Sequence, residues 1–290
     1  MLLPPMKPAP FHYHAPKTIE EAVATLARVA PDDGRVLAGG QSLVPTMAFR
    51  LARPRHLVDI NGVAALARLS VEGEHLCIGA TVRHAAFERP VAKGPLGELL
   101  RDIVQHIAHR PIRTRGTFCG SIAHADPASE WCLVAAVLDA EMVVRSVRRE
   151  RVIAAKDFFD AIMTTALEDN ELLTEVRLPL LAPDARCGFY EFNRRAGDFA
   201  IAMALVTYRL KDSQIAEPRV AIGGVEAFPR RIASAEALLA GRAPDAKTFA
   251  AAAEAAAEAA DPLYDESISA EYRRGLVRTV ALRALEQANQ

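Results

Sequence analysis

Two glycine-containing turns constrain this chain most, because each lies between an apolar run and a helical pattern. The first reads Ala38-Gly39-Gly40-Gln41-Ser42-Leu43, and the second reads Gly116-Thr117-Phe118-Cys119-Gly120-Ser121. Glycine lets the backbone approach a ligand without interference from a Cβ, and the free N–H groups at a helix start favour an anion. A single Gly-Gly pair is more often a tight turn without a ligand. Two such turns in one chain favour a diphosphate held from two sides.

Charged residues flank the second turn. It is preceded by three cations that can offset diphosphate charge, although at least two of them fit a solvated surface equally well: Arg110, Arg113 and Arg115. His124 and Asp126 follow the turn, and Asp126 before Pro127 fits a helix N-cap at least as well as a ligand contact. Neither turn has the Gly-x-Gly-x-x-Gly of a nicotinamide-binding domain, and no Gly-Lys-Ser/Thr is present for a nucleoside triphosphate.

Composition narrows the classes of protein that remain. The 290 residues are 51% hydrophobic and 24% charged, which is globular and long enough for two domains. A formal net charge of −1 argues against nucleic acid as a partner. The four cysteines are scattered without metal-binding or iron–sulfur spacing, so we expect reduced thiols in a cytoplasmic protein. No apolar run approaches the roughly 18 residues of a membrane span, and residues 1–10 do not read as a secretory leader.

Hydrophobic periodicity predicts helices and strands in alternation over the first 180 residues. Helices are expected at 19–26 with Thr18 as cap, at 43–51 with Ser42 as cap, and at 96–109 and 130–138. Strands are expected at 35–38, 57–60, 76–80, 141–145 and 171–179, and a helix start at 81–87. Beyond a boundary near 181–184, three consecutive strands at 188–195, 200–210 and 219–225 indicate an antiparallel sheet, followed by helices from 234 to 290. The predicted class is α+β.

Taken together, these motifs resemble the flavoprotein medium subunit of molybdenum hydroxylases, the xanthine dehydrogenase and aerobic carbon monoxide dehydrogenase family. The resemblance covers almost the whole chain, and its motifs in this order are highly specific. They lie at residues 37–45, 50–54, 78–81, 115–127, 157–159, 171–174, 195–200 and 272–274.

The resemblance implies an FAD-binding domain of the vanillyl-alcohol oxidase (PCMH) type over residues 1–182. This domain would consist of two α/β subdomains, at about 1–60 and 61–182, and a C-terminal domain at 183–290 would contain a three-stranded antiparallel sheet and helices. The resemblance also implies partners: a small subunit with two [2Fe-2S] clusters and a large molybdopterin subunit, assembled as a dimer of heterotrimers. Electrons would reach FAD in this chain and leave to an external acceptor, so no catalytic residue is assigned here.

The resemblance also implies which residues meet FAD. The first motif would place five residues at its diphosphate, with Leu37 and Leu43 flanking them as further cofactor-binding residues: Ala38, Gly39, Gly40, Gln41 and Ser42. The second would place four more on the other side: Thr117, Cys119, Gly120 and Ser121. Ala80 and Thr81 belong to the same cofactor set, and His124 and Asp126 would lie near the ribityl or adenosine portion. Leu173 would meet the isoalloxazine through its backbone, and Phe199 would lie near the ring, although an aromatic residue on a strand is more often part of the core.

Cys119 departs from the family pattern, which usually reads Thr-x-Gly-Gly. Its Cβ limits how closely the backbone can approach phosphate and disfavours a positive φ. A reactive thiol near the flavin is one reading, and a small buried hydrophobic residue is the better one. For the first turn, we expect a bulky residue at Gly39 or Gly40 to release FAD while leaving the fold largely intact.

Two other functions stay open on sequence grounds. A stand-alone FAD oxidase or reductase of the same fold would need a proton donor, for which His12, His14 and His124 are the candidates. A non-enzymatic scaffold that has lost FAD is the other, and Cys119 is its only sequence hint. Copurifying partners and flavin colour distinguish all three.

Overall fold

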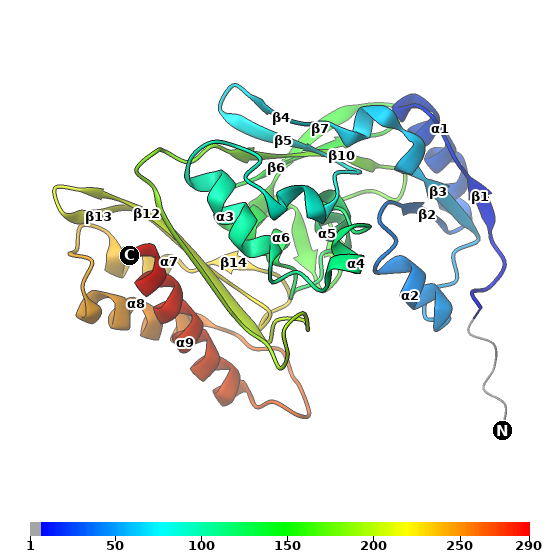
Figure 1. The fold of residues 1–290 in the computed structure, drawn as a ribbon. Helices are drawn as coiled ribbons and strands as arrows, with labels where there is room; N and C mark the ends of the chain where they lie inside the picture. The colour runs from blue at the N-terminus through cyan, green and yellow to red at the C-terminus, as the bar shows by residue number, and fades with distance from the viewer. Residues whose placement is uncertain (1–6) are drawn as a thin grey trace.

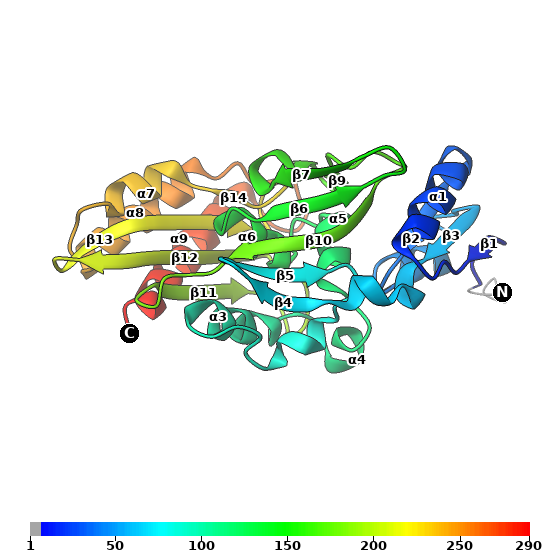
Figure 2. The same ribbon diagram turned by 90° about the horizontal axis from the view of Figure 1, so that it is seen from above.

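The computed structural model describes residues 7–290. The prediction about a secretory leader concerned residues 1–10, of which residues 1–6 lie outside the described part. Three sheets follow one another along the molecule, as the view from above makes plain (Figure 1 and Figure 2). A three-stranded sheet lies at the N-terminal end, a five-stranded sheet in the middle and a four-stranded sheet at the C-terminal end. No helix among residues 7–290 is long and apolar enough to cross a membrane.

The first sheet is parallel, with strand order β1-β3-β2. Its strands are β1 (His12–His14), β2 (Gly34–Leu37) and β3 (His56–Asp59), of which β1 was not predicted. Thr18 caps α1 (Ile19–Val29) as expected, because its hydroxyl accepts the Glu21 N–H at 3.1 Å. The next helix, α2 (Leu43–Ala48), is shorter than predicted and Ser42 makes no side-chain capping bond.

The central sheet has strand order β4-β5-β10-β6-β7, and all its neighbours run antiparallel. The helix–strand alternation of the sequence therefore corresponds to parallel pairing only in the first sheet. The strands of the central sheet are β4 (Leu69–Glu72), β5 (His75–Gly79), β6 (Glu141–Arg145), β7 (Glu150–Ala154) and β10 (Leu172–Pro179). A small separate hairpin pairs β8 (Phe159–Ala161) with β9 (Thr164–Thr165).

Helices α3 (Pro95–Val104), α4 (Arg110–Arg113), α5 (Phe118–His124) and α6 (Glu130–Val137) lie on one side of the central sheet (Figure 1). Two local predictions were wrong here. Ser129 rather than Asp126 caps α6, accepting the Cys132 N–H at 3.4 Å, while Asp126 accepts from Ala128 N at 2.9 Å. The segment predicted as a helix start at 81–87 begins in a turn, is extended at Arg83 and then forms a 3-10 helix, His84–Glu88.

The C-terminal sheet contains one strand more than predicted. Strands β11 (Arg186–Phe192), β12 (Ala202–Lys211) and β13 (Gln214–Gly223) correspond to the three expected, and β14 (Arg230–Arg231) pairs antiparallel with β13. A two-residue strand is too short to show the alternation by which strands are recognised in sequence. Helices α7 (Ala233–Leu239), α8 (Ala246–Ala259) and α9 (Ala270–Ala288) complete this part.

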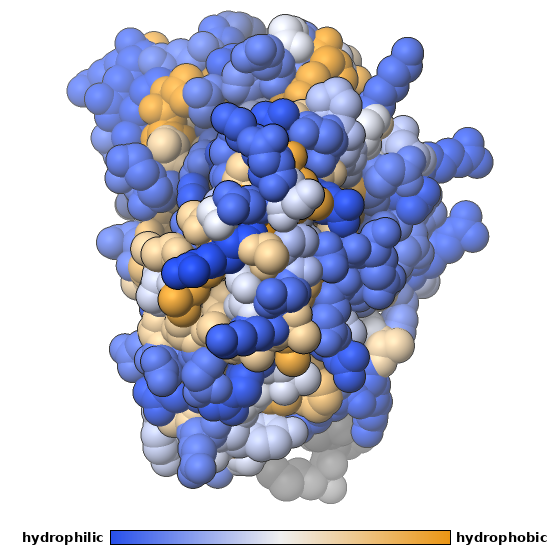
Figure 3. Space-filling model, turned by 90° about the vertical axis from the view of Figure 1, so that its left-hand side faces the viewer, coloured by the Kyte–Doolittle hydropathy of each residue, from blue (hydrophilic) through white to orange (hydrophobic). Residues whose placement is uncertain are grey.

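Strand β12 is buried on both faces of this sheet, which is why it reads as a nearly continuous apolar run. Met203 and Leu205 of β12 join the core of the first two sheets, whereas Ala204 and Val206 pack with α8 and α9. The end of the molecule formed by these C-terminal elements is mostly hydrophilic, and its hydrophobic residues form small separate groups (Figure 3). The domain boundaries near 60 and 182 stay predictions.

Candidate functional site

The two glycine turns touch each other, although one belongs to the first sheet and the other to the helical layer of the second. A Cβ placed on Gly39 would lie 2.5 Å from the Arg115 carbonyl oxygen and 2.6 Å from Gly116 Cα. A Cβ on Gly120 would lie 3.9 Å from the Ala38 Cβ. The absence of a side chain at Gly39 is therefore what lets the two backbones meet.

The first turn leaves several polar groups available to a ligand. Gly40 has a φ of +71°, a left-handed conformation that favours glycine. Among the contacts within residues 7–290, the backbone N–H groups of Gly40, Gln41 and Ser42 donate no hydrogen bond. The Gln41 amide donates to the Gly39 carbonyl at 3.0 Å, which ties the turn to itself. Unpaired backbone donors beside a glycine turn form the kind of concave site that binds anions.

The second turn is organised by the start of α5. The Thr117 hydroxyl caps this helix by accepting the Gly120 N–H at 3.0 Å, and Thr117 is 2% exposed. Cys119 lies inside the helix and is not among the positive-φ residues. The left-handed conformation considered for position 119 is thus not required, and the Cβ adds no backbone strain.

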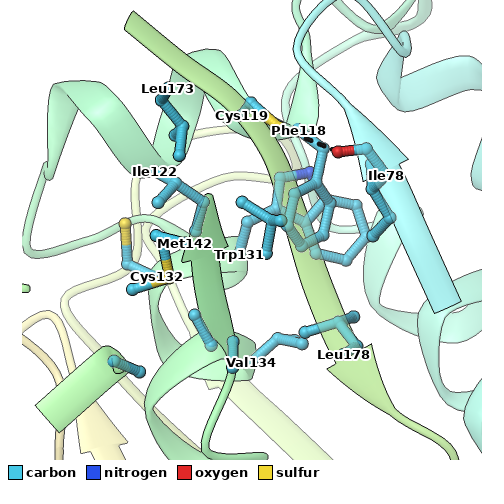
Figure 4. Packing of buried hydrophobic residues seen from close by; sticks show 14 of the residues in the cluster. Ile78, Phe118, Cys119, Ile122, Trp131, Cys132, Val134, Met142, Leu173 and Leu178 are labelled. Carbon is cyan, nitrogen blue, oxygen red and sulfur yellow. Dashed lines mark hydrogen bonds between the residues drawn. The ribbon is translucent and has the colours of Figure 1, made fainter. Parts of the chain in front are cut away.

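The Cys119 side chain points into the core rather than toward the first turn. Its thiol donates to the Ile78 carbonyl oxygen at 3.3 Å, with Ile122 and Leu173 close by in the same apolar cluster (Figure 4). Burial raises the pKa of this thiol far above its ordinary value. The reading of Cys119 as a small buried hydrophobic residue is confirmed, and the reading as a reactive thiol is wrong.

This geometry changes the substitution test expected for the first turn. A side chain at Gly39 would strike the Arg115 and Gly116 backbone and separate the turns, whatever ligand is present. A side chain at Gly40 would meet Leu37 and Val44 at 3.2 Å in a strained conformation. Loss of FAD from either variant could therefore result from displacement of the turn as well as from blocked access of the phosphate to the backbone. Other residues offer a cleaner test.

Two residues that sequence reasoning missed connect the turns. The Asn61 amide donates to the Ala38 carbonyl at 2.7 Å, and its oxygen accepts from Arg83 at 2.5 Å. Arg83 also donates to the Arg115 carbonyl oxygen. Both are polar residues shortly after strands of neighbouring sheets, which was a usable signal. The helix start predicted at 81–87 conceals this signal at Arg83, which is extended in the structure.

His84 supports the second turn from inside the core. The Trp131 indole N–H donates to His84 Nδ1 at 2.9 Å, so the neutral ring carries its proton on Nε2, the edge that lies against Gly116. Burial lowers the pKa of His84 to about 4, with the Arg83 and Arg113 charges acting in the same direction. His84 is therefore a neutral structural residue at physiological pH.

The three arginines before the second turn have different surroundings. Arg113 forms an ion pair with Glu88, with Nε 3.0 Å from Oε1, and it donates to the Ile107 and Ala108 carbonyls. The positive charge of Arg113 is therefore balanced within the protein. Arg110 and Arg115 are exposed.

The remaining predicted site residues lie in three places. Ala80 and Thr81 are buried at the end of β5, where the Ala80 N–H donates to the Thr174 carbonyl at 3.0 Å next to buried Leu173. Ser121 and His124 are half-buried within α5, and Asp126 is half-buried just after it. Phe199 lies in the loop between β11 and β12 and is 74% exposed, so the core reading of this aromatic is wrong. It lines a cavity of about 470 Å³ with Arg194 and Arg273.

The histidines near the N-terminus form a separate group. His14 Nε2 and His56 Nδ1 are 3.0 Å apart, and His56 Nε2 is 3.1 Å from an Asp32 carboxylate oxygen. His12 stacks on His56 with ring centroids 5.1 Å apart. These contacts hold β1 against β3.

Comparison with known proteins agrees with this arrangement. The family described as FAD binding domain in molybdopterin dehydrogenase matches residues 9–181, and the CO dehydrogenase flavoprotein C-terminal domain matches residues 188–288. The nicotine 6-hydroxylase medium subunit of Paenarthrobacter nicotinovorans is 38% identical over 98% of this chain and 99% of its own length. The carbon monoxide dehydrogenase medium chain of Hydrogenophaga pseudoflava is 34% identical over 98% of both chains.

Solved structures show the same fold. Carbon monoxide dehydrogenase from Hydrogenophaga pseudoflava superposes with a TM-score of 0.92 at 34% identity, covering 97% of this chain and 98% of that one. Quinoline 2-oxidoreductase from Pseudomonas putida 86 gives a TM-score of 0.92 at 35% identity over 98% of both chains. This chain therefore belongs to the FAD-binding medium subunits of molybdenum-containing hydroxylases and dehydrogenases, the flavoprotein family of carbon monoxide dehydrogenase and xanthine dehydrogenase.

Proposed function

We propose that this chain holds FAD with its diphosphate between the two glycine turns and serves as an electron-transfer subunit. The contact of Gly39 with Arg115 and Gly116 carries the proposal, because it brings together two turns of a kind that binds anions, one from the first sheet and one from the helical layer of the second. The FAD-binding part would extend over residues 1–182, and the C-terminal domain over 183–290.

The residues present fit a diphosphate group. The first turn offers unpaired N–H donors at Gly40, Gln41 and Ser42, and the Ser42 hydroxyl is not used for capping. Arg83 lies beside both turns and supplies a cation, while Arg113 is neutralised by Glu88. Opposite charge and oriented donors together stabilise a bound phosphate.

When bound, FAD would accept electrons and pass them on, and the protein would set its position and potential. The chain's own residues then act as binding groups: the turn backbones hold the diphosphate, and Thr117 and His84 keep the second turn in place from within the core. No side chain is needed as a general base. Leu173 and Phe199 are proposed neighbours of the isoalloxazine.

We further propose that electrons come from [2Fe-2S] clusters of a small partner subunit, that a large molybdopterin subunit oxidises the substrate, and that an external acceptor removes the electrons. The supporting fact is that the relatives are themselves named as medium chains or as single subunits of dehydrogenase complexes. We expect a dimer of heterotrimers located in the cytoplasm. The four free cysteines are consistent with that reducing compartment.

Purification of the tagged full-length chain from its own host tests the proposal. We expect a yellow protein that releases FAD on denaturation and copurifies with two further chains, iron and molybdenum. A colourless chain without partners would contradict the proposal and favour a scaffold. A yellow chain that is reduced by a substrate on its own, without partners, would contradict it in favour of a stand-alone oxidase.

A further inference from the structure

A continuous hydrogen-bonded connection joins the two glycine turns from outside. It begins at the Ala38 carbonyl, which accepts from Asn61 Nδ2 at 2.7 Å, and continues from Asn61 Oδ1 to Arg83 Nη2 at 2.5 Å. It ends where Arg83 Nη1 donates to the Arg115 carbonyl. The two carbonyls at its ends belong to the residues immediately before Gly39 and Gly116. The connection therefore spans the same two backbones that meet at Gly39.

Both members of this connection are held in one orientation. The second N–H of the Asn61 amide donates to Asp59 Oδ1 at 2.6 Å, and the Asn61 backbone N–H donates to the same oxygen at 2.9 Å. The other Asp59 oxygen accepts from the Tyr13 hydroxyl at 2.5 Å. With both amide hydrogens donated and the oxygen accepting, the amide cannot flip without losing all three contacts.

Arg83 is held just as firmly from the other side. Its backbone lies against the second turn, since Phe118 N donates to Val82 O at 3.1 Å and His84 N donates to Gly116 O at 3.0 Å. Its planar guanidinium then bridges the Arg115 carbonyl of that turn and Asn61, which follows the last strand of the first sheet. Burial lowers the pKa of Arg83 and the Asp59 carboxylate opposes this, but an arginine stays charged at any physiological pH.

We propose that Asn61 and Arg83 form a brace that sets the separation of the two glycine turns and thereby determines the affinity for FAD. The proposal rests on the function proposed above, and it makes Asn61 and Arg83 positioning residues. The first turn belongs to the first sheet and the second to α5, so their spacing is not set by a shared element. A ligand gripped from both sides loses affinity when that spacing relaxes, because binding must then restore it.

The test compares four variants of the full-length apoprotein: Asn61→Ala, Arg83→Met, Arg83→Lys and the double variant Asn61→Ala/Arg83→Met. FAD affinity is measured from the change in flavin fluorescence on binding, and apoprotein stability from thermal unfolding. Arg209→Met is the matched control, because Arg209 forms an exposed pair with Asp184 in the C-terminal part. It removes the same guanidinium away from both turns.

We expect Asn61→Ala and Arg83→Met each to weaken FAD binding on the order of tenfold or more, and the control to leave it unchanged. Arg83→Lys keeps the charge but cannot donate to Asn61 and Arg115 in one plane, so it should resemble Arg83→Met. The double variant should lose little more affinity than Arg83→Met alone, because both substitutions break one connection and only Arg83→Met also removes the cation beside the turns.

Three results would overturn the brace. These are FAD binding within about twofold of wild type in Asn61→Ala, independent losses that multiply in the double variant, or wild-type affinity in Arg83→Lys, which would show that charge alone matters. These outcomes are separable from failure of the proposed function. If the wild-type apoprotein takes up no FAD, the function itself is wrong, whereas equal FAD binding by wild type and variants removes only the brace.

Discussion

Burial decides the chemistry of Cys119, the one residue at which the second turn departs from the family pattern. Its thiol is 2% exposed and donates to the Ile78 carbonyl, and burial strongly raises its pKa. A thiol without accessible thiolate is neither a nucleophile nor a redox partner. The Cβ that was expected to limit the approach of phosphate belongs to a side chain packed in the core (Figure 4).

We predict that Cys119 in the native protein resists alkylation by iodoacetamide. Its labelling should be at least about a hundredfold slower than that of an exposed cysteine, because both access and the thiolate form are lacking. Peptide mass spectrometry after timed labelling measures this. Labelling of the same peptide in denaturant is the control, and rapid native modification would show that the thiol is accessible.

Helix α6 and strand β11 each contribute a carboxyl to one pair, of which Glu130 is buried and Glu191 half-buried. Glu130 begins α6 and Glu191 lies on β11, and burial raises the pKa of both, with their mutual repulsion adding to the rise for Glu130. Asp126 raises the pKa of Glu130 further, while Asn193 donates to Glu191 Oε1 at 2.8 Å. Glu191 Oε2 has no hydrogen-bond partner among the described residues. A proton shared with Glu130 would give this oxygen a partner.

We predict that the free energy of unfolding decreases as the pH rises from about 4.5 to about 8. The folded state keeps a proton that the unfolded chain releases near pH 4.5, so the stabilisation is complete below that value and is lost through the raised pKa. Glu191→Gln removes one titrating group and should flatten this dependence, gaining stability relative to wild type toward pH 8. Thermal unfolding at several pH values measures it.

The matched control for that experiment is Glu150→Gln, because Glu150 is exposed on β7. It should leave the slope of stability against pH unchanged. If wild type and Glu191→Gln show parallel pH profiles, the two carboxyls do not share a proton.

At the scale of the whole molecule, the C-terminal sheet is a middle layer between the FAD-binding part and the last helices. The approach of α9 to β11 is close because Gly188 has no side chain: a Cβ there would lie 1.9 Å from the Ala284 carbonyl oxygen. That oxygen is backbone and cannot move without shifting the helix. One glycine thus sets the packing distance of an entire layer.

We predict that Gly188→Ala lowers the free energy of unfolding by about 1–3 kcal/mol or more, because α9 must move away from the sheet. Gly275→Ala in the same helix is the control. A Cβ there meets nothing within 4 Å, so it should raise stability by up to about 1 kcal/mol. Urea unfolding of both variants measures the difference, and equal stability of Gly188→Ala and wild type would contradict the packing argument.

Local signals predicted a large part of this structure. Thr18 as cap, the helices predicted at 96–109 and 130–138 and three of the four C-terminal strands follow from periodicity and capping chemistry, which depend on neighbouring residues alone. The first of these helices ends at Val104, earlier than predicted. Predictions failed where an element was too short to show a pattern, or where the local backbone conformation decided which side chain caps a helix. Strand β14 has two residues, and Ser129 rather than Asp126 caps α6 because Asp126 turns back to Ala128.

The sequence by itself determined the family and the two glycine turns, because their motifs are contiguous and their chemistry follows from residue type. Only the tertiary structure decided that the turns touch, because Gly39 follows β2 whereas Gly116 lies between α4 and α5, and the placement of these elements depends on the whole core. The same holds for Asn61 and Arg83, whose roles depend on which carbonyls lie within reach. It holds for Cys119 too, since its place in α5 directs its side chain toward Ile78 of β5 in the core.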